Sequence, residues 1–280
     1  MSVYAHPEVL VETDWVAQHQ SDPKVRLVEV DVDTGSYDKG HIPGAIGLHW
    51  NRELQRHPVR DLLAKEELGK LLGERGIASD HTVIAYGDNN NWFAAWFFWL
   101  LKYYGHADAR LMNGGRAKWV AENRELTTDA PTHATAKYQV KDPDASLRAL
   151  RDYVLASLKD KKHLVDVRSP KEFSGELLAP ENLPQEGAQR GGHIPGAANI
   201  PWAQAVKEDG TFKSADDLRA LYEGKGVTKE KETIAYCRIG ERSSHTWFVL
   251  KYLLGYPNVR NYDGSWTEWG SLIGAPIDKP

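Results

Sequence analysis

The hexapeptide Gly-His-Ile-Pro-Gly-Ala occurs twice in the chain, at residues 40–45 and again at residues 192–197. A strand-like run precedes each copy: Leu-Val-Glu-Val-Asp-Val at 27–32 and Leu-Val-Asp-Val-Arg at 164–168. The offset of about 150 residues is far longer than the period of a solenoid repeat and has the length of a whole domain.

Further matched segments follow both copies in the same order. They are strand-like runs at 82–87 and 233–237, helical runs at 92–104 and 243–254, Arg-Leu-Met-Asn-Gly-Gly at 110–115 against Arg-Asn-Tyr-Asp-Gly at 260–264, and tryptophan-containing helix starts at 117–119 and 267–269. Matching elements in matching order indicate a duplicated domain. Strands that alternate with helices predict an α/β fold, so we expect two similar domains, each a parallel sheet flanked by helices.

The domain boundaries follow from a stretch of weak periodicity between the halves. Residues 129–146 contain two prolines among many Thr and Ala residues, which is typical of a linker. We therefore predict an N-terminal domain at 1–128 and a C-terminal domain at 147–280. A second irregular stretch, 175–191, interrupts only the second half, and a loop of this length inside a compact domain is often functional.

Two helices are predicted from their own residues. Leucines at 68, 71 and 72 have helical spacing within residues 65–74. Ser214 precedes two acidic residues, Asp216 and Asp217, as an N-cap precedes the acids of a first helical turn.

Composition limits the classes of function. The chain has 35 Lys and Arg against 39 Asp and Glu, a net charge of -4, so neither a nucleic-acid nor a membrane partner is expected. The most apolar run, residues 92–101, is too short to span a bilayer and is predicted to be a buried helix. Residues 1–14 do not resemble a secretory signal. With a single cysteine, no internal disulfide or cysteine-based metal site can form, and a cytoplasmic location is expected.

That single cysteine, Cys237, stands where a strand-like run meets a helical run. Loops of this kind turn several backbone N–H groups toward one centre, and the helix adds its positive end. A thiolate or a bound anion is favoured there, and two flanking arginines, Arg238 and Arg242, should lower the pKa of the thiol. A free cysteine is more often a buried apolar side chain, but the polar neighbours favour a nucleophile. The equivalent residues of the first half, 86–91, contain no cysteine and no arginine.

The chain resembles the tandem-domain thiosulfate sulfurtransferases of the rhodanese family. The resemblance rests on the paired His-Ile-Pro-Gly-Ala segments, the cysteine loop, and Asp-Gly-Ser-Trp at 263–266, and it covers essentially the whole chain. It implies an inactive N-terminal domain, an active C-terminal domain, and a site that faces the cleft between them. It also implies that sulfur is carried as a persulfide on Cys237, with no cofactor and no metal.

The loop departs from the commonest family pattern, Cys-Arg-Lys-Gly-Val-Thr. Cys237, Arg238 and Gly240 match, whereas Ile239, Glu241 and Arg242 replace Lys, Val and Thr. We expect Arg242 to supply the missing charge as the main ligand of the sulfur donor. We expect Arg238, at the next position after the cysteine, to assist it.

Two arginines outside the loop are further candidates for donor binding. Arg190 ends the long irregular stretch and is either a substrate ligand or a solvated loop charge. Arg168 follows a strand, where ligands of such sheets bind, or it pairs with Glu172. The histidines of the two repeated hexapeptides, His41 and His193, are expected to support turns, because the half without a cysteine has one too.

The predicted reaction moves sulfur from thiosulfate to cyanide or a thiol through a persulfide on Cys237. Three alternatives remain open. A 3-mercaptopyruvate sulfurtransferase is opposed by Arg238, and a cysteine phosphatase by a loop one residue too short for phosphate. A non-catalytic module that senses sulfide or docks a partner would be favoured by an inert Cys237.

Overall fold

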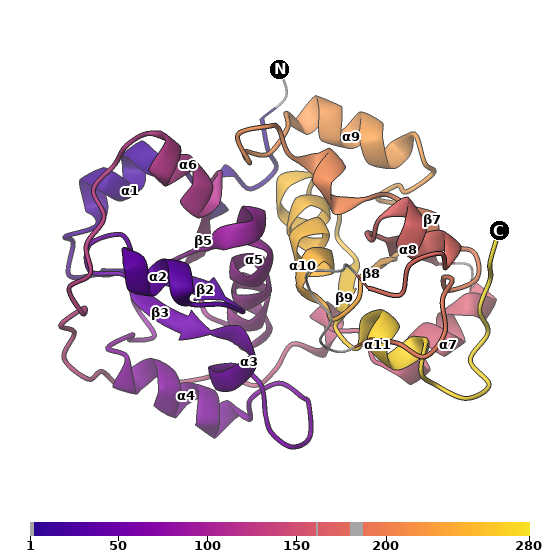
Figure 1. Cartoon of the computed structure of the whole chain (residues 1–280), viewed down its shortest axis with the longest axis horizontal. Coiled ribbons are helices and arrows are strands. Elements are labelled where there is room, and N and C mark those ends of the chain that lie inside the picture. Colours follow the sequence, from indigo (N-terminus) through magenta and orange to yellow (C-terminus); the bar gives the residue numbers. More distant parts are fainter. Residues whose placement is uncertain (1–2, 161, 180–186) are drawn as a thin grey trace. The chain divides into compact units, whose positions relative to one another are not determined.

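The computed structural model describes residues 3–160, 162–179 and 187–280, and the chain forms two compact units (Figure 1). The N-terminal unit comprises Glu8–Asp144 and Glu208–Phe212. The C-terminal unit comprises Ala145–Lys207, Lys213–Pro280 and the described residues up to Pro7. The boundary at Asp144 lies inside the predicted linker. The described residues up to Pro7 come from the first half of the sequence but belong to the C-terminal unit, and Glu208–Phe212 come from the second half but belong to the N-terminal unit.

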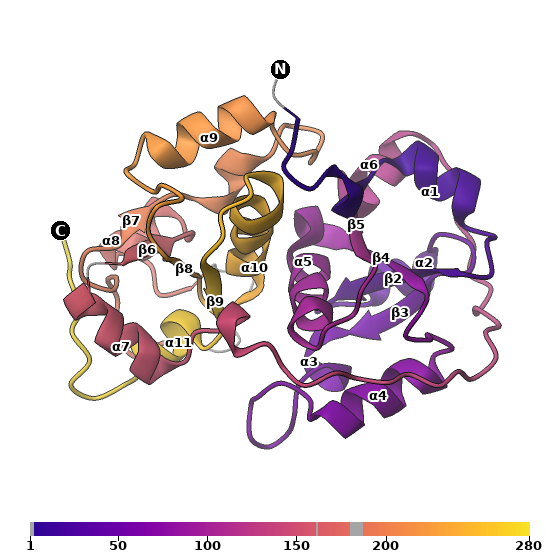
Figure 2. The same ribbon diagram turned by 180° about the vertical axis from the view of Figure 1, so that it is seen from behind.

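The N-terminal unit is built on a parallel sheet. Its elements are η1 (Pro7–Val9), β1 (Leu10–Val11), α1 (Thr13–His19), β2 (Val25–Asp31), α2 (Gly35–Lys39), β3 (Ile46–His49), α3 (Trp50–Glu53), α4 (Lys65–Glu74), β4 (Thr82–Tyr86), α5 (Asp88–Tyr103), β5 (Ala109–Met112) and α6 (Gly115–Ala121). Among the described residues the strand order is β1-β5-β4-β2-β3, and Figure 2 shows β4, β2 and β3 side by side. The apolar helix α5 packs on β2, β4 and β5, while side chains of α1 and α6 join the core cluster of the sheet.

The C-terminal unit repeats this plan. Its elements are η2 (Ala145–Leu147), α7 (Arg151–Asp160), β6 (His163–Asp166), α8 (Pro170–Ser174), β7 (Ala198–Asn199), η3 (Trp202–Ala205), α9 (Ala215–Glu223), β8 (Thr233–Tyr236), α10 (Glu241–Phe248), the π-helical turn η4 (Val249–Leu253), β9 (Val259–Tyr262) and α11 (Ser265–Trp269). The strands in the described part of this unit pair in parallel in the order β7-β6-β8-β9. Helix α10 packs on β8 and β9, and α7 and α11 contribute to the core of the unit.

The predicted fold class is therefore confirmed, together with both helices predicted from single segments. Helix α4 has the predicted bounds, and the Ser214 side chain accepts a hydrogen bond from the Asp217 N–H at the start of α9. The predicted buried helix lies within α5, whose apolar side chains are almost entirely inaccessible. Of the predicted irregular stretch 175–191, residues 180–186 lie outside the described residues. In the part of the chain that the structure describes, no helix has the length and apolar content of a membrane-spanning segment.

The repeated hexapeptide has the same contacts in both units, which explains its recurrence. The Ile42 N–H donates to the hydroxyl of Tyr86, and the Ile194 N–H donates to the hydroxyl of Tyr236. His41 stacks on an aromatic ring at 3.9 Å, and His193 does so at 3.6 Å. The hydrogen bonds join each turn to a strand, β4 or β8, and the stacked rings join it to the helix before it, α2 or α8. They agree with the supporting role expected for the two histidines.

Candidate active site

The Cys237 loop joins a strand to a helix at the carboxyl edge of the C-terminal sheet. Cys237 directly follows β8, and α10 begins at Glu241. The cysteine is fully buried, with a relative exposure of 0%. The Gly240 N–H donates to Cys237 Sγ over 3.1 Å, and the hydroxyl of Ser243 lies 3.7 Å from the same sulfur. These donors and the positive end of α10 favour negative charge on the sulfur.

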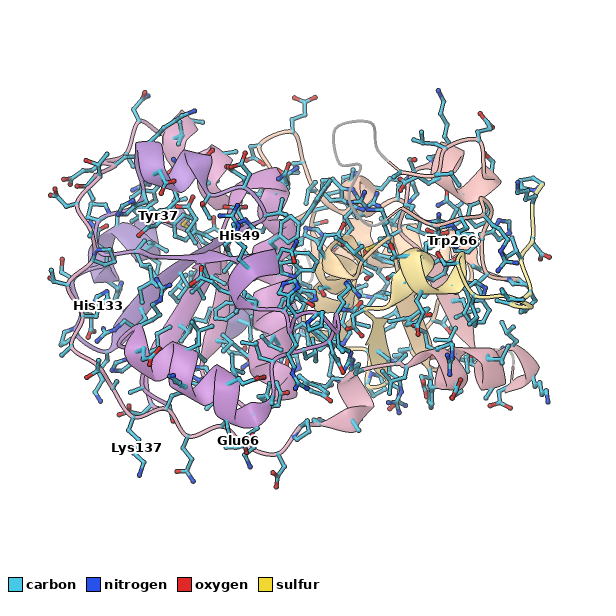
Figure 3. All side chains as sticks on the ribbon, turned by 60° about the horizontal axis from the view of Figure 1, so that its bottom comes forward. Tyr37, His49, Glu66, His133, Lys137 and Trp266 are labelled. Atoms are coloured by element: carbon cyan, nitrogen blue, oxygen red, sulfur yellow. The ribbon has the colours of Figure 1, made fainter. Side chains whose placement is uncertain are left out.

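The Asp-Gly-Ser-Trp segment holds the loop from behind. Ser265 Oγ accepts a hydrogen bond from the Cys237 N–H over 3.0 Å. The Trp266 N–H donates to the Cys237 carbonyl over 3.1 Å, and the Thr267 N–H donates to the Arg238 carbonyl over 3.0 Å. Trp266, labelled in Figure 3, lies on α11 in the core of the unit. The Asp-Gly-Ser-Trp segment and the residue after it thus position the backbone of the cysteine loop.

Gly240 makes the tight path of this loop possible. Its φ of +100° lies in the left-handed region, which side-chain-bearing residues rarely adopt. A Cβ at this position would lie 2.7 Å from the Cα of Asp263. The Gly240 carbonyl accepts hydrogen bonds from the Ser244 hydroxyl at 2.7 Å and from the Asn261 amide at 3.2 Å. The hydrogen bonds of its carbonyl therefore hold Gly240 in the orientation in which its N–H points at the sulfur.

Glu241 brings a carboxylate to the cysteine, a contact that the sequence did not reveal. Its Oε2 lies 3.3 Å from Cys237 Sγ in hydrogen-bonding geometry, and its relative exposure is 1%. Burial raises the pKa of the Cys237 thiol, and the charge of Glu241 raises it further, while Arg242 and Ser243 act in the opposite direction. The net shift is upward, whereas the sequence predicted a lowered pKa. The reason is first the burial of the thiol, which the sequence does not show, and then the negative charge of Glu241 beside it.

Arg242 is bound to a carboxylate from another helix. Its two terminal nitrogens donate to the two oxygens of Glu172, on α8, at 3.0 Å each, and its Nε lies 3.4 Å from Glu241 Oε1. Burial raises the pKa of Glu172, but the hydrogen bonds and charge of Arg242 outweigh it, so this pKa lies below its ordinary value. Arg242 has a relative exposure of 4%. Its role in donor binding stays a prediction, and a donor would have to compete with Glu172 for the terminal nitrogens of Arg242.

The other predicted arginines lie in different surroundings. Arg238, in the loop, is buried. Arg168 is fully buried, forms an ion pair of 2.6 Å with Asp166 rather than with Glu172, and lies 4.5 Å from the ring of Trp266. Arg190 donates to the carbonyls of Gly270 and Leu272, just after α11. Arg238 and Arg242 therefore lie at the cysteine loop, whereas the contacts found for Arg168 and Arg190 are with other parts of the unit, and the roles of all four in donor binding stay predictions.

The equivalent loop of the N-terminal unit has a different backbone. It follows β4 and includes the first residues of α5, where Asn89, Asn90 and Asn91 have non-helical φ angles of 50°, 53° and 66°. Asparagine tolerates this left-handed conformation better than most residues. The side chain of Asn91 accepts a hydrogen bond from the Gly87 N–H over 3.0 Å. An amide therefore stabilises this loop, which has no sulfur nucleophile.

Within the described residues, no group of three or more His, Cys, Asp or Glu side chains is arranged to hold a metal ion. The chemistry available at this site is that of a buried thiol, a neighbouring carboxylate and an anion-favouring loop.

Comparison with known proteins agrees with this site. Residues 12–122 and 150–272 each match the rhodanese-like domain. The "Sulfur carrier protein TtuD" of Thermus thermophilus is 60% identical over 280 residues, which cover 99% of this chain and 98% of the relative. The "Putative thiosulfate sulfurtransferase" of Saccharopolyspora erythraea is 58% identical over 273 residues, which cover 98% of this chain and 97% of the relative.

Solved structures share the fold at lower identity. The crystal structure of YnjE aligns with a TM-score of 0.88 at 27% identity, over 100% of this chain and 70% of that chain. The wild-type structure of EanB aligns with a TM-score of 0.88 at 25% identity, over 100% of this chain and 71% of that chain. The parallel α/β domains and the cysteine loop between a strand and a helix agree with a sulfurtransferase of the rhodanese type. The chain belongs to the rhodanese family, with two rhodanese-like domains in tandem.

Proposed function

We propose that this protein is a thiosulfate sulfurtransferase that carries sulfur as a persulfide on Cys237. The observation that carries the proposal is the hydrogen bond of 3.1 Å from the Gly240 N–H to the cysteine sulfur. A backbone donor fixed by its surroundings stabilises negative charge without reorganising during the reaction. A persulfide is anionic, so the same loop suits the loaded protein.

The first half-reaction loads the sulfur. The Cys237 thiolate attacks the outer sulfur of thiosulfate, a new S–S bond forms to Sγ, and the S–S bond of thiosulfate breaks. Sulfite leaves with the electron pair of the broken bond, and a persulfide anion remains on the protein. In the second half-reaction a nucleophile, cyanide or a thiolate, takes the outer sulfur and regenerates the Cys237 thiolate.

We assign donor binding to the arginines of the loop itself, Arg238 and Arg242. Guanidinium groups bind oxyanions through paired, charge-assisted hydrogen bonds. The arginine pair suits the dianion thiosulfate, and the name of the Saccharopolyspora erythraea relative supports the same donor. The name of the Thermus thermophilus relative, a sulfur carrier protein, supports the carriage of sulfur on this chain.

A Cys237→Ser variant tests the proposal. Incubation with thiosulfate and no acceptor should add one sulfur atom, about 32 Da, to the wild-type chain and none to the variant, by intact mass spectrometry. The variant should also release no thiocyanate from thiosulfate and cyanide. An adduct that persists in the variant, or thiocyanate release near the wild-type rate, would reject Cys237 as the carrier. A parallel assay with 3-mercaptopyruvate decides the donor: faster loading from it would replace thiosulfate in the proposal.

A further inference from the structure

Two buried groups in the cysteine loop can share one proton. Cys237 Sγ and Glu241 Oε2 are 3.3 Å apart, and the relative exposures of the two residues are 0% and 1%. The thiol is the donor in this contact and the carboxylate is the acceptor. Nothing in the proposed function assigns a role to this carboxylate.

Sulfur chemistry requires that the thiol lose its proton, because the thiolate is the nucleophile. Release of the proton to solvent would leave two adjacent buried anions, which is electrostatically costly. Transfer to the carboxylate only moves the negative charge from oxygen to sulfur, so the net charge of the buried pair does not change.

The charged groups around the pair are compatible with this exchange. Arg242 Nε lies 3.4 Å from Glu241 Oε1, on the side away from the sulfur, and Glu172 holds that guanidinium from α8. Arg238 belongs to the same loop. Asp263, which packs against Gly240, is paired with Arg148 through two hydrogen bonds of 2.9 Å.

Neutral groups complete the surroundings of the sulfur. They are the Gly240 N–H, which donates to the sulfur, and the hydroxyl of Ser243, which lies 3.7 Å from the sulfur and donates its proton to Asn261 Oδ1 over 2.6 Å. The remaining titratable side chain of α10 is His245, which stays uncharged at neutral pH because burial lowers its pKa to about 3. Among the described residues, Glu241 is the carboxylate in hydrogen-bonding contact with the sulfur, and it can take the thiol proton.

We propose that Glu241 is a catalytic residue, the proton acceptor that converts the Cys237 thiol into the attacking thiolate. The inference rests on the proposed function and deepens it. The thiol proton passes to the Glu241 carboxylate, the thiolate forms the new bond to the outer sulfur of the donor, and sulfite departs with the electron pair. The proton then passes from Glu241 to sulfite. The loop is left with the persulfide anion and the regenerated carboxylate.

The pH dependence of cysteine alkylation tests Glu241 independently of sulfur transfer. Iodoacetamide, a neutral reagent, is used on the wild type and on Glu241→Gln, which keeps the size of the side chain but cannot accept the proton. In the variant the proton must go to solvent, so the alkylation rate should rise about tenfold per pH unit below the thiol pKa. In the wild type the pair carries one proton throughout this range, so the rate should change less than about twofold per unit between about pH 6 and 7.5.

Two further variants make the result decisive. Glu241→Asp keeps a carboxylate and should keep the shallow profile at a lower rate. Glu29→Gln removes a buried carboxylate from its ion pair with Arg116 in the N-terminal unit and should leave the profile unchanged. Equal slopes for the wild type and Glu241→Gln, whether both steep or both shallow, would overturn the proposal.

The sulfur-loading assay separates this inference from the proposed function. If thiosulfate loads no sulfur while alkylation shows the expected difference in slope, the donor assignment fails and the role of Glu241 as proton acceptor stands. If loading occurs and its rate is as steep with pH in the wild type as in Glu241→Gln, the function stands and the role of Glu241 is refuted.

Discussion

Arg242→Ala should lower the free energy of unfolding of the C-terminal unit. The substitution removes both 3.0 Å hydrogen bonds to Glu172 and leaves that carboxylate buried, at a relative exposure of 1%. Breaking one side of a buried ion pair costs about 3–5 kcal/mol. Glu172 keeps two hydrogen bonds of 3.0 Å from Ser169, so we expect a loss near the lower limit, about 3 kcal/mol.

The pH dependence of this loss gives a sharper test. In the folded wild type the pKa of Glu172 lies below its ordinary value, so its carboxylate stabilises the fold above about pH 4.3, and this stabilisation fades as the pH falls toward the folded pKa. In Arg242→Ala, burial remains without its compensation, and the pKa of Glu172 should rise above the ordinary value. The difference in unfolding free energy from the wild type should therefore be larger at pH 7 than at pH 4.

Urea unfolding at both pH values measures this difference, with Glu172→Gln as the matched variant. A stability loss under about 0.5 kcal/mol, or one of equal size at both pH values, would refute the buried-pair reasoning. The KM for thiosulfate separates the two roles of Arg242. If the guanidinium binds the donor, Arg242→Ala raises KM while Glu172→Gln, which frees the guanidinium, lowers it. If it only fixes the loop, both variants shift KM in the same direction.

Two substitutions in the loop and behind it should also be informative. Gly240→Ala should lower the free energy of unfolding by more than about 2 kcal/mol and slow sulfur loading at least tenfold, because the residue has a φ of +100° and the new Cβ would lie 2.7 Å from Asp263. Gly226→Ala is the control for backbone strain alone, because Gly226 has a φ of +76° and no atom within 4 Å of the new Cβ. Thermal unfolding of this control should show a loss of about 1 kcal/mol. Ser265→Ala should lower the free energy of unfolding by about 1–2 kcal/mol and slow the alkylation of Cys237, because the Cys237 N–H loses its acceptor. Unchanged stability would mean that another group replaces the hydroxyl.

The sequence was sufficient for the fold because the relevant signals are local. The repeated turn, the strand-like runs and the leucine spacing of residues 65–74 are properties of short segments, and backbone preference together with apolar patterning determines such segments. The cysteine loop was found in the same way, because a strand, a polar turn and a helix follow one another in the chain. In the structure, both units have the predicted parallel sheet with helices between the strands.

Tertiary structure alone decided which charges meet at the site. Glu172 and Arg242 are 70 positions apart in the chain, and Ser265 is 28 positions from Cys237. Such partners depend on how the strands and helices pack, which spacing along the sequence does not encode. The pKa of Cys237 is a second example. The arginines are visible in the sequence, whereas the burial of the thiol and the distance between its sulfur and the Glu241 carboxylate are properties of the folded loop.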